Sequence, residues 1–314
     1  MRRPSARARL PGVNRQRVIL DAAIERSVIR GTLTATTGPR SEFHGWLELN
    51  TALEAILDPG TNRAPIQDAY DIRTPMPRPM QDNPLRKHVT AYDRADGIAT
   101  IKMDDGKVNA LGIPMLRELH AAFDRAEEDN AIVILTGREG RFSAGFDLNV
   151  FSDTPEQLPE MLTLGANLCE RILTFPRPVV TACTGHGVAA GCFIQLAADL
   201  RLGVDGPFQI GLSEVRIGLT MPQFVVELAR SRLTPSHFDR AVNSAVMYAP
   251  ADAVSAGFLD RVVSAEELQP AALDAARGLS GLNTEAHKAT KLKSRAGLID
   301  AVHAAIAAEF NMAA

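Results

Sequence analysis

Two segments of the sequence place small residues where a buried strand gives way to a helix. The first is GRFSAGFDL at 140–148, which follows the apolar run AIVILTG. The second is TGHGVAAGCF at 184–193, which follows PVVTAC. A turn of this kind leaves backbone N–H groups free at a helix N-terminus, where the helix dipole favours negative charge. Two such N–H groups aimed at one oxygen form an oxyanion hole, so the segments together predict a site that stabilises negative charge on an oxygen.

A regular alternation of strands and helices is expected to position these turns. VTAYDRADGIATIKM predicts two strands joined at Ala-Asp-Gly, and apolar residues recur at a helical period across IPMLRELHAAFDRAEED. Two further buried strands, AIVILTG and PVVTACTG, alternate with the helical segments LTLGANLCERILTF and GCFIQLAADLRLG. The alternation predicts an α/β fold with right-handed crossovers onto buried sheets, followed by a helical tail.

Composition narrows the range of partners. A net charge of −3 gives no reason to expect nucleic acid, and no apolar run is long enough to span a membrane. The 3 cysteines are odd in number, lie in apolar surroundings and have no metal-ligand spacing. We therefore expect buried thiols in a reducing compartment, and a cytoplasmic protein.

Residues 1–85 differ in character from the rest and predict an N-terminal extension, either accessory or poorly ordered. Its arginine-rich start is read as a disordered extension or an upstream start site, with a transit peptide or basic arm as the alternatives. VIRGTLTATTG predicts a strand, and SEFHGWLELNTALEAILDPG a loop that leads into an amphipathic helix ending at Pro59. The proline-rich stretch RTPMPRPMQDNP is typical of a linker.

Over roughly residues 88–295 the chain resembles the crotonase, or enoyl-CoA hydratase/isomerase, superfamily. RFSAGFDL is similar to the AG-x-D oxyanion loop of that family, and PRPVVTACTGHGVAAGCFIQLAADLRLG to its second oxyanion segment. GKVNALGIPMLREL resembles the first CoA-contacting loop, and FQIGLSEVRIGLTMP the segment with a catalytic glutamate. YAPADAVSAGFLDRVVSAEEL resembles a further family stretch. Several motifs in the family's order are far more specific than any single glycine pattern.

The resemblance implies a spiral of strand–strand–helix repeats in a core at 86–270. It also implies a helical C-terminal region at 271–314, through which a homotrimer or hexamer would form. The substrate would be an acyl-CoA thioester, with no metal and no cofactor beyond the coenzyme A that the substrate carries. No nucleic acid or membrane partner is implied.

The resemblance also assigns roles to individual residues. The backbone N–H groups of Phe146 and Ala190 would hold the thioester oxygen, and Glu214 would be the acid/base. Burial would raise the pKa of Glu214 toward a usable value, whereas the alternative for this residue is a surface carboxylate. The residues expected to bind substrate are Asn109, Ala110, Leu111, Ala144, Gly145, Gly187, Gly191 and Phe193.

Phe193 stands where hydratases of the family carry a second glutamate. A phenyl ring neither activates water nor carries a proton, so one carboxylate remains, and double-bond isomerisation is favoured over hydration. The stretch GLTMPQFVVELARSRL also replaces the family's glycine-rich segment after the glutamate. The alternatives are a non-catalytic acyl-CoA-binding homologue and an enolate-based hydrolase or lyase.

Other polar residues near these motifs are expected to be structural. Asp147 would cap the helix after the first turn, and His186 would be packed or hydrogen-bonded. Gln195 and Asp199 would make structural hydrogen bonds. The basic residues Lys288, Lys291, Lys293 and Arg295 would form a solvated face, or one of them would lie near the CoA phosphates.

Overall fold

The computed structural model describes residues 18–25, 28–35, 40–44 and 89–310. The chain divides into two compact units, residues 1–79 and 80–314. Residues 271–310 belong to the same unit as residues 89–270.

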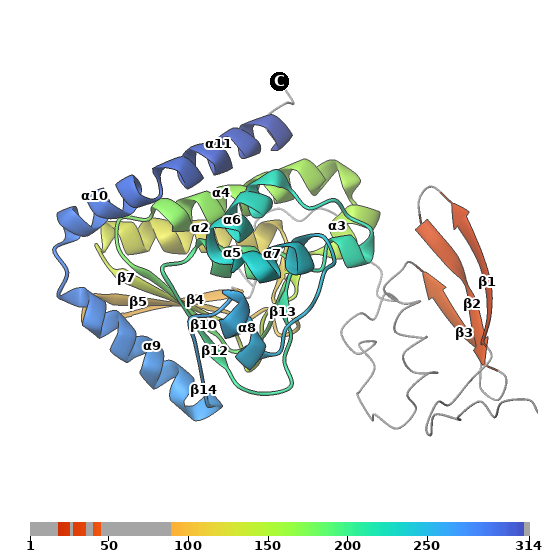
Figure 1. The fold of residues 1–314 in the computed structure, drawn as a ribbon, viewed down its shortest axis with the longest axis horizontal. Coiled ribbons are helices and arrows are strands. Elements are labelled where there is room, and N and C mark those ends of the chain that lie inside the picture. Colours follow the sequence, from red (N-terminus) through yellow and green to blue (C-terminus); the bar gives the residue numbers. More distant parts are fainter. Residues whose placement is uncertain (1–17, 26–27, 36–39, 45–88, 311–314) are drawn as a thin grey trace, which may run out of the picture. The chain divides into compact units, whose positions relative to one another are not determined.

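In the first unit, β1 (Val18–Glu25), β2 (Val28–Ala35) and β3 (Arg40–His44) form an antiparallel sheet in that order (Figure 1). The predicted strand is β2, but the loop expected at SEFH is wrong because these residues belong to β3. Their register, from Arg30 opposite His44 to Thr34 opposite Arg40, explains the difference. Pairing with β2 supplies the backbone hydrogen bonds that side-chain pattern alone does not indicate. The amphipathic helix and the linker predicted after it lie outside the described residues.

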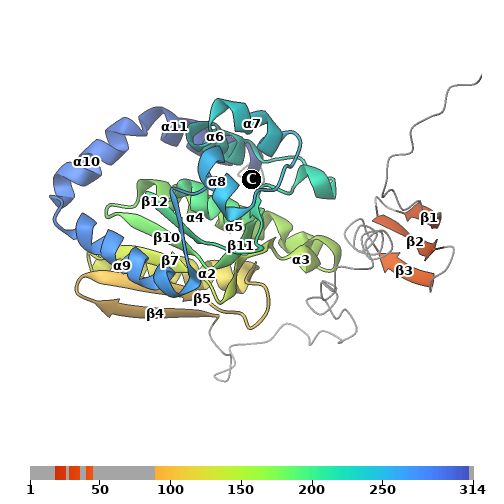
Figure 2. The ribbon, with the colours of Figure 1, turned by 60° about the horizontal axis from the view of Figure 1, so that its bottom comes forward.

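The second unit is built on a six-stranded sheet with the order β14-β12-β10-β7-β5-β4 (Figures 1 and 2). All neighbours are parallel except β4 and β5, which form the predicted antiparallel pair. The strands are β4 (Thr90–Ala95), β5 (Ile98–Met103), β7 (Ile132–Thr136), β10 (Val179–Cys183), β12 (Leu200–Val204) and β14 (Arg261–Val263). Every residue of β7 and β10 is buried, as their continuous apolar runs predicted.

Short strands, which alternate along the chain with the strands of the large sheet, form two smaller sheets. β8 (Gly140–Ser143), β11 (Gly185–Val188) and β13 (Ile210–Gly211) pair in parallel, in the order β13-β11-β8. β6 (Ala110–Leu111) pairs with β9 (Gly145–Phe146). Four times, after β5, β7, β10 and β12, the chain runs from a strand of the large sheet through one or two short strands into a helical segment. This confirms the predicted strand–strand–helix repeat.

Helices cover both faces of the large sheet, as Figure 1 shows. α9 packs against β7, β10 and β12 on one face, where Ile132, Ile134 and Val180 point. Val133 and Leu135 point to the other face, into the larger core that includes residues of α2, α4, α5 and α11. The helices are α2 (Ile113–Glu128), α3 (Leu148–Ser152), α4 (Leu158–Thr174), α5 (Ala190–Ala197), α6 (Gln223–Arg232), α7 (Pro235–Val242), α8 (Pro250–Ala256), α9 (Ala265–Ser280), α10 (Thr284–Ser294) and α11 (Ala296–Phe310). The last described residues form helices α9, α10 and α11, which confirms the predicted helical C-terminal region.

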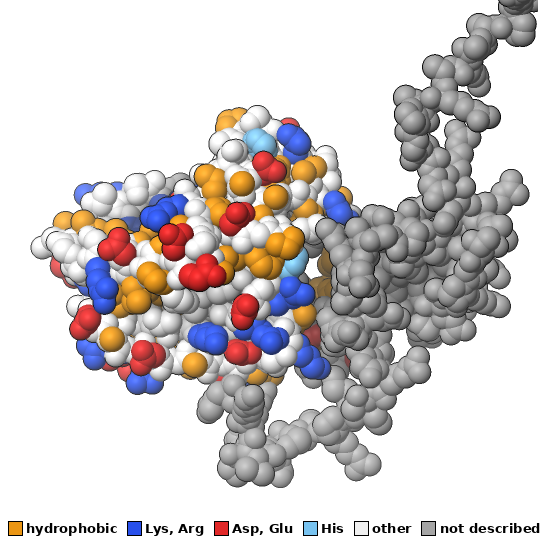
Figure 3. All heavy atoms as spheres, turned by 90° about the horizontal axis from the view of Figure 1, so that it is seen from below, with side chains coloured by type: hydrophobic (Ala, Val, Ile, Leu, Met, Phe, Trp, Pro, Cys, Tyr) orange, Lys and Arg blue, Asp and Glu red, His pale blue; other side chains and the backbone are white. Residues whose placement is uncertain are grey.

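On the face shown in Figure 3, acidic and basic side chains of the described residues are interspersed. No helix in the described part of the chain is both long enough and apolar enough to cross a membrane.

Candidate active site

The turn between β11 and α5 leaves one backbone amide open. Ala189, the N-cap of α5, has φ 50° and ψ −128°, a conformation that costs a non-glycine residue on the order of 1–3 kcal/mol. Its N–H donates to Gly211 O at 3.0 Å, and its carbonyl accepts from the N–H groups of Cys192 and Phe193. No turn or cap hydrogen bond from the N–H of Ala190 is found among the described residues. The turn is therefore held from both sides, while the buried Ala190 amide is left without a partner of this kind.

The turn after β8 reaches the same point. Gly145 has φ 95°, and a Cβ added there would lie 2.6 Å from Ala189 Cβ and 3.1 Å from Ala190 N. Gly191 is equally tight, because its added Cβ would lie 2.7 Å from Ser143 Cβ. The two predicted turns thus meet, although they are far apart in sequence. Phe146 follows Gly145 directly, so its peptide is joined to the residue that contacts the Ala190 turn.

The loop before β6 holds the turn after β8 in place through hydrogen bonds. Asn109 is fully buried, and its Nδ2 donates to the carbonyls of Met103 and Phe142 at 3.0 and 3.1 Å. Ser143 Oγ donates to Asn109 O at 2.7 Å and accepts from the Gly145 N–H at 3.1 Å. The Asn109 side chain therefore shapes the loop from inside the protein and is not open to a ligand. Its neighbours Ala110 and Leu111, in β6, lie opposite Gly145 and Phe146 of β9.

Sequence reasoning did not single out two supports of the turns. Gly211 O anchors Ala189, and Ser143 Oγ joins Asn109 to Gly145. Ser143 lies within the motif RFSAGFDL, but a hydroxyl with two backbone partners is visible only once the segments have come together.

Glu214 is brought to this site by the small sheet. β13 pairs with β11, and Glu214 comes three residues after Gly211, as the N-cap of the 3-10 turn Val215–Ile217. Its side chain lies close enough to the first turn of α5 for its charge to act on Cys192, whose thiol pKa is raised by burial, by Cys183 and by Glu214. The two predicted turns and the predicted acid/base are therefore neighbours in the fold.

The Glu214 carboxyl is suited to proton transfer near neutral pH. The residue is 6% exposed, and its Oε2 is buried with no hydrogen-bond partner among the described residues. Burial raises the pKa of Glu214 to about 7, against a smaller lowering by backbone N–H groups of residues 213 and 214. The surface position considered for Glu214 is wrong. A carboxyl with a pKa of about 7 can both accept and release a proton.

The raised pKa of Glu214 predicts a specific pH dependence of stability. The folded state holds this proton up to about pH 7, whereas the unfolded chain loses it near pH 4.5. The stability from the protonated carboxyl is thus full below pH 4.5 and lost as the pH rises toward 7. We expect the free energy of unfolding to fall across this window by on the order of 3 kcal/mol relative to the Glu214→Gln variant. Urea titrations of both proteins at pH 4.5 and pH 8 measure this difference, and parallel curves would contradict the assignment.

Phe193 lies in an aromatic row inside the core. It is 1% exposed, and its ring meets those of Phe146 and Phe224 edge-on, with centroids 6.2 and 6.0 Å apart. The position next to Ala190 where a second acid would stand is therefore hydrocarbon. Phe193 is thus packed in the core beside the candidate site, and its contact with substrate stays a prediction.

Other predicted residues have structural partners. Asp147 caps α3 by accepting from the Asn149 N–H at 3.0 Å, as expected. His186 Nδ1 accepts from the Gln209 N–H at 3.1 Å, and its ring lies edge-on to Phe208. A Cβ at Gly187 would collide with the Gln195 amide, so close packing requires glycine there. Ala144, which precedes Gly145, is half-buried.

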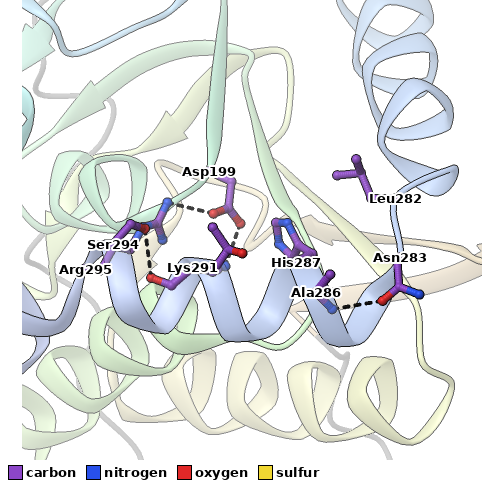
Figure 4. Close-up of a pocket in the computed structure, with 9 residues that line it drawn as sticks. Asp199, Leu282, Asn283, Ala286, His287, Lys291, Ser294 and Arg295 are labelled. Atoms are coloured by element: carbon purple, nitrogen blue, oxygen red, sulfur yellow. Dashed lines mark hydrogen bonds and ion pairs between the residues drawn. The ribbon is translucent and has the colours of Figure 1, made fainter.

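A separate polar cluster lies at α10 (Figure 4). Asp199 accepts from Lys291 Nζ and from an Arg295 Nη, each at 2.7 Å, and from the Val179 N–H. Lys291 is only 5% exposed, so the solvated face expected for the basic stretch is wrong at this residue. Burial lowers the pKa of Lys291, while Asp199 opposes the change. An open hollow of about 430 Å³ beside this cluster is lined by no residue of the candidate site.

No group of acidic, histidine or cysteine side chains suited to a metal ion occurs within the described residues.

The fold repeats a strand–strand–helix unit, and two of its backbone turns meet at the Ala190 amide with a buried carboxyl nearby. Together these features define a crotonase-like protein. The chain belongs to the enoyl-CoA hydratase/isomerase family, whose family model matches residues 93–314.

Individual relatives agree with this assignment. An enoyl-CoA hydratase/isomerase family protein from Pseudomonas syringae is 48% identical with a TM-score of 0.70, over 71% of this chain and 97% of that structure. A probable enoyl-CoA hydratase from Mycobacterium tuberculosis is 42% identical with a TM-score of 0.68, over 72% of this chain and 97% of that structure. The mitochondrial enoyl-CoA delta isomerase 1 of Homo sapiens is 28% identical over 208 residues, 65% of this chain and 69% of that protein.

Proposed function

We propose that this protein is an enoyl-CoA isomerase that moves a double bond between C3 and C2 of an acyl-CoA thioester. One observation carries the proposal. The site has a single buried carboxyl, Glu214, beside the open amide of Ala190, while the buried ring of Phe193 occupies the place of a second acid. The human relative named enoyl-CoA delta isomerase 1 supports the same choice.

The N–H groups of Ala190 and Phe146 hold the thioester carbonyl oxygen. Glu214 removes a proton from C2 of a 3-enoyl thioester, and the electron pair spreads over C2 to C4 and onto that oxygen. The two amides stabilise this dienolate because they are aimed where the charge develops. The protonated Glu214 then delivers the proton to C4, which leaves the double bond between C2 and C3. The carboxylate is regenerated, and no atom is gained or lost.

Hydration would place a further demand on the site. Water must be activated at C3 while another group manages the proton at C2, and Phe193 offers only hydrocarbon next to Ala190. Isomerisation needs neither a second acid nor a water molecule. We accordingly propose an acyl-CoA thioester as the only small-molecule partner, with no further cofactor, and a homotrimer or hexamer as the assembly.

Incubating the purified chain with 3-enoyl-CoA and, separately, with 2-enoyl-CoA tests the proposal. We expect interconversion at constant mass, followed by the ultraviolet absorbance of the conjugated thioester. A product heavier by one water would instead identify a hydratase. Binding of acyl-CoA without turnover would identify a non-catalytic homologue, and release of free coenzyme A an enolate-based hydrolase or lyase.

A further inference from the structure

We propose that Gly165, in the middle of α4, is a positioning residue for the oxyanion hole. Its missing side chain provides the space in which the ring of Phe146 lies, and the seated ring fixes the backbone amide of Phe146. The inference rests on the proposed function in one respect, the use of that amide to hold a thioester oxygen.

The contact between Gly165 and Phe146 is specific. A Cβ at Gly165 would lie 2.5 Å from Phe146 Cζ and closer still to Cε1, nearer than real Cβ atoms approach other atoms. Two other helical glycines differ, since a Cβ at Gly278 in α9 or at Gly297 in α11 would meet no atom within 4 Å. Glycine is unfavourable inside a helix, so its presence at 165 is explained by the ring that lies against it.

The half-buried Phe146 ring is backed by a second aromatic ring on the side away from solvent. It meets the Phe193 ring edge-on, and Phe193 is itself 1% exposed and packed against Phe224. A methyl group at 165 would clash with this ring and would therefore displace the backbone of Phe146. The peptide that carries its N–H is joined to Gly145, a residue whose backbone can adopt conformations that other residues rarely reach. We infer that the amide would turn away from the thioester oxygen.

The test compares Gly165→Ala with Gly278→Ala, a matched helical substitution into open space. We expect Gly165→Ala to lower kcat for 3-enoyl-CoA roughly tenfold or more, with KM changed much less, because a small misplacement of a transition-state donor acts on kcat. Gly278→Ala should leave both constants unchanged. A wild-type kcat in folded Gly165→Ala would overturn the inference.

A double variant separates positioning from general damage. In a Phe146→Ala background the clash is gone, so adding Gly165→Ala should have no further effect on kcat. If Gly165→Ala lowers kcat there as much as it does in the wild type, Gly165 acts through something other than the Phe146 ring.

A spectroscopic measurement reports on the hole without any turnover. Hexanoyl-CoA with a 13C-labelled carbonyl cannot isomerise, and the hole should lower its carbonyl stretching frequency when it binds. We expect a smaller shift in Gly165→Ala and in Phe146→Ala, and the full shift in Gly278→Ala. If Gly165→Ala does not fold, an unchanged shift in Phe146→Ala would overturn the inference.

These readouts also separate the inference from the proposed function. A wild type that shifts the carbonyl but turns over neither enoyl-CoA would refute the isomerase and leave the role of Gly165 standing. Equal turnover in Gly165→Ala and wild type would refute the role of Gly165 and leave the isomerase standing. A wild type that does not bind hexanoyl-CoA would refute both.

Discussion

Replacing Glu214 with glutamine should lower kcat for conversion of 3-enoyl-CoA to 2-enoyl-CoA by roughly 10²- to 10⁴-fold. The amide has the shape of the carboxyl but cannot accept the C2 proton, and Glu214 is the one buried carboxyl within the described part of the chain. Affinity for acyl-CoA should change little, because the backbone amides are untouched. Stopped assays for kcat and calorimetric titration with a saturated acyl-CoA measure the two effects.

The exposed Glu139 provides the control, since Glu139→Gln makes the same chemical change outside the site. It should leave kcat unaltered. In the wild type, kcat/KM should rise with pH through about 7, where Glu214 loses its proton. Substantial turnover in Glu214→Gln, or a pH profile that is flat near 7, would show that another group is the base.

Replacing Gly145 with alanine should lower kcat by roughly 10²- to 10³-fold, the loss associated with removal of one oxyanion donor. The new methyl would lie 2.6 Å from Ala189 Cβ and 3.1 Å from Ala190 N, so it would push the two turns apart and cover the open amide. The measurement is kcat and KM on 3-enoyl-CoA, with circular dichroism to establish that the variant is folded.

Gly97→Ala is the matched control for backbone strain. Gly97 has φ 75°, in the same left-handed region as Gly145, but a Cβ there would meet no atom within 4 Å. It should cost stability without loss of kcat. Equal kcat losses in the two variants would mean that strain, and not the approach to Ala190, explains the effect at Gly145.

The position at Phe193 also bears on any attempt to change the reaction. A carboxylate placed there would be enclosed by the rings of Phe146 and Phe224, and burying an unpaired charge is strongly unfavourable. The aromatic row would have to be rebuilt before a second acid could serve hydration. Under the proposed isomerase function, the packed rings would oppose hydration in addition to the missing glutamate.

The sequence by itself determined much of the local structure. Apolar runs predicted the buried strands β7 and β10, helical periodicity predicted α2, and small residues marked the turns before α3 and α5. These features follow from short-range rules, since strand burial, helix period and backbone freedom depend on neighbouring residues. The residue types present for chemistry are likewise read directly from the sequence, with glutamate at 214 and phenylalanine at 193.

Only the tertiary structure decided which of these groups meet. Gly145 reaches Ala190 because β8 and β11 share a small sheet, and β13 brings Glu214 to the same place. Burial of Glu214 and Lys291, the β3 pairing and the fit of Gly165 to a phenyl ring likewise depend on segments distant in sequence. The pKa of a carboxyl and the space open to a side chain are set by whatever packs around them, and a linear pattern does not contain that information.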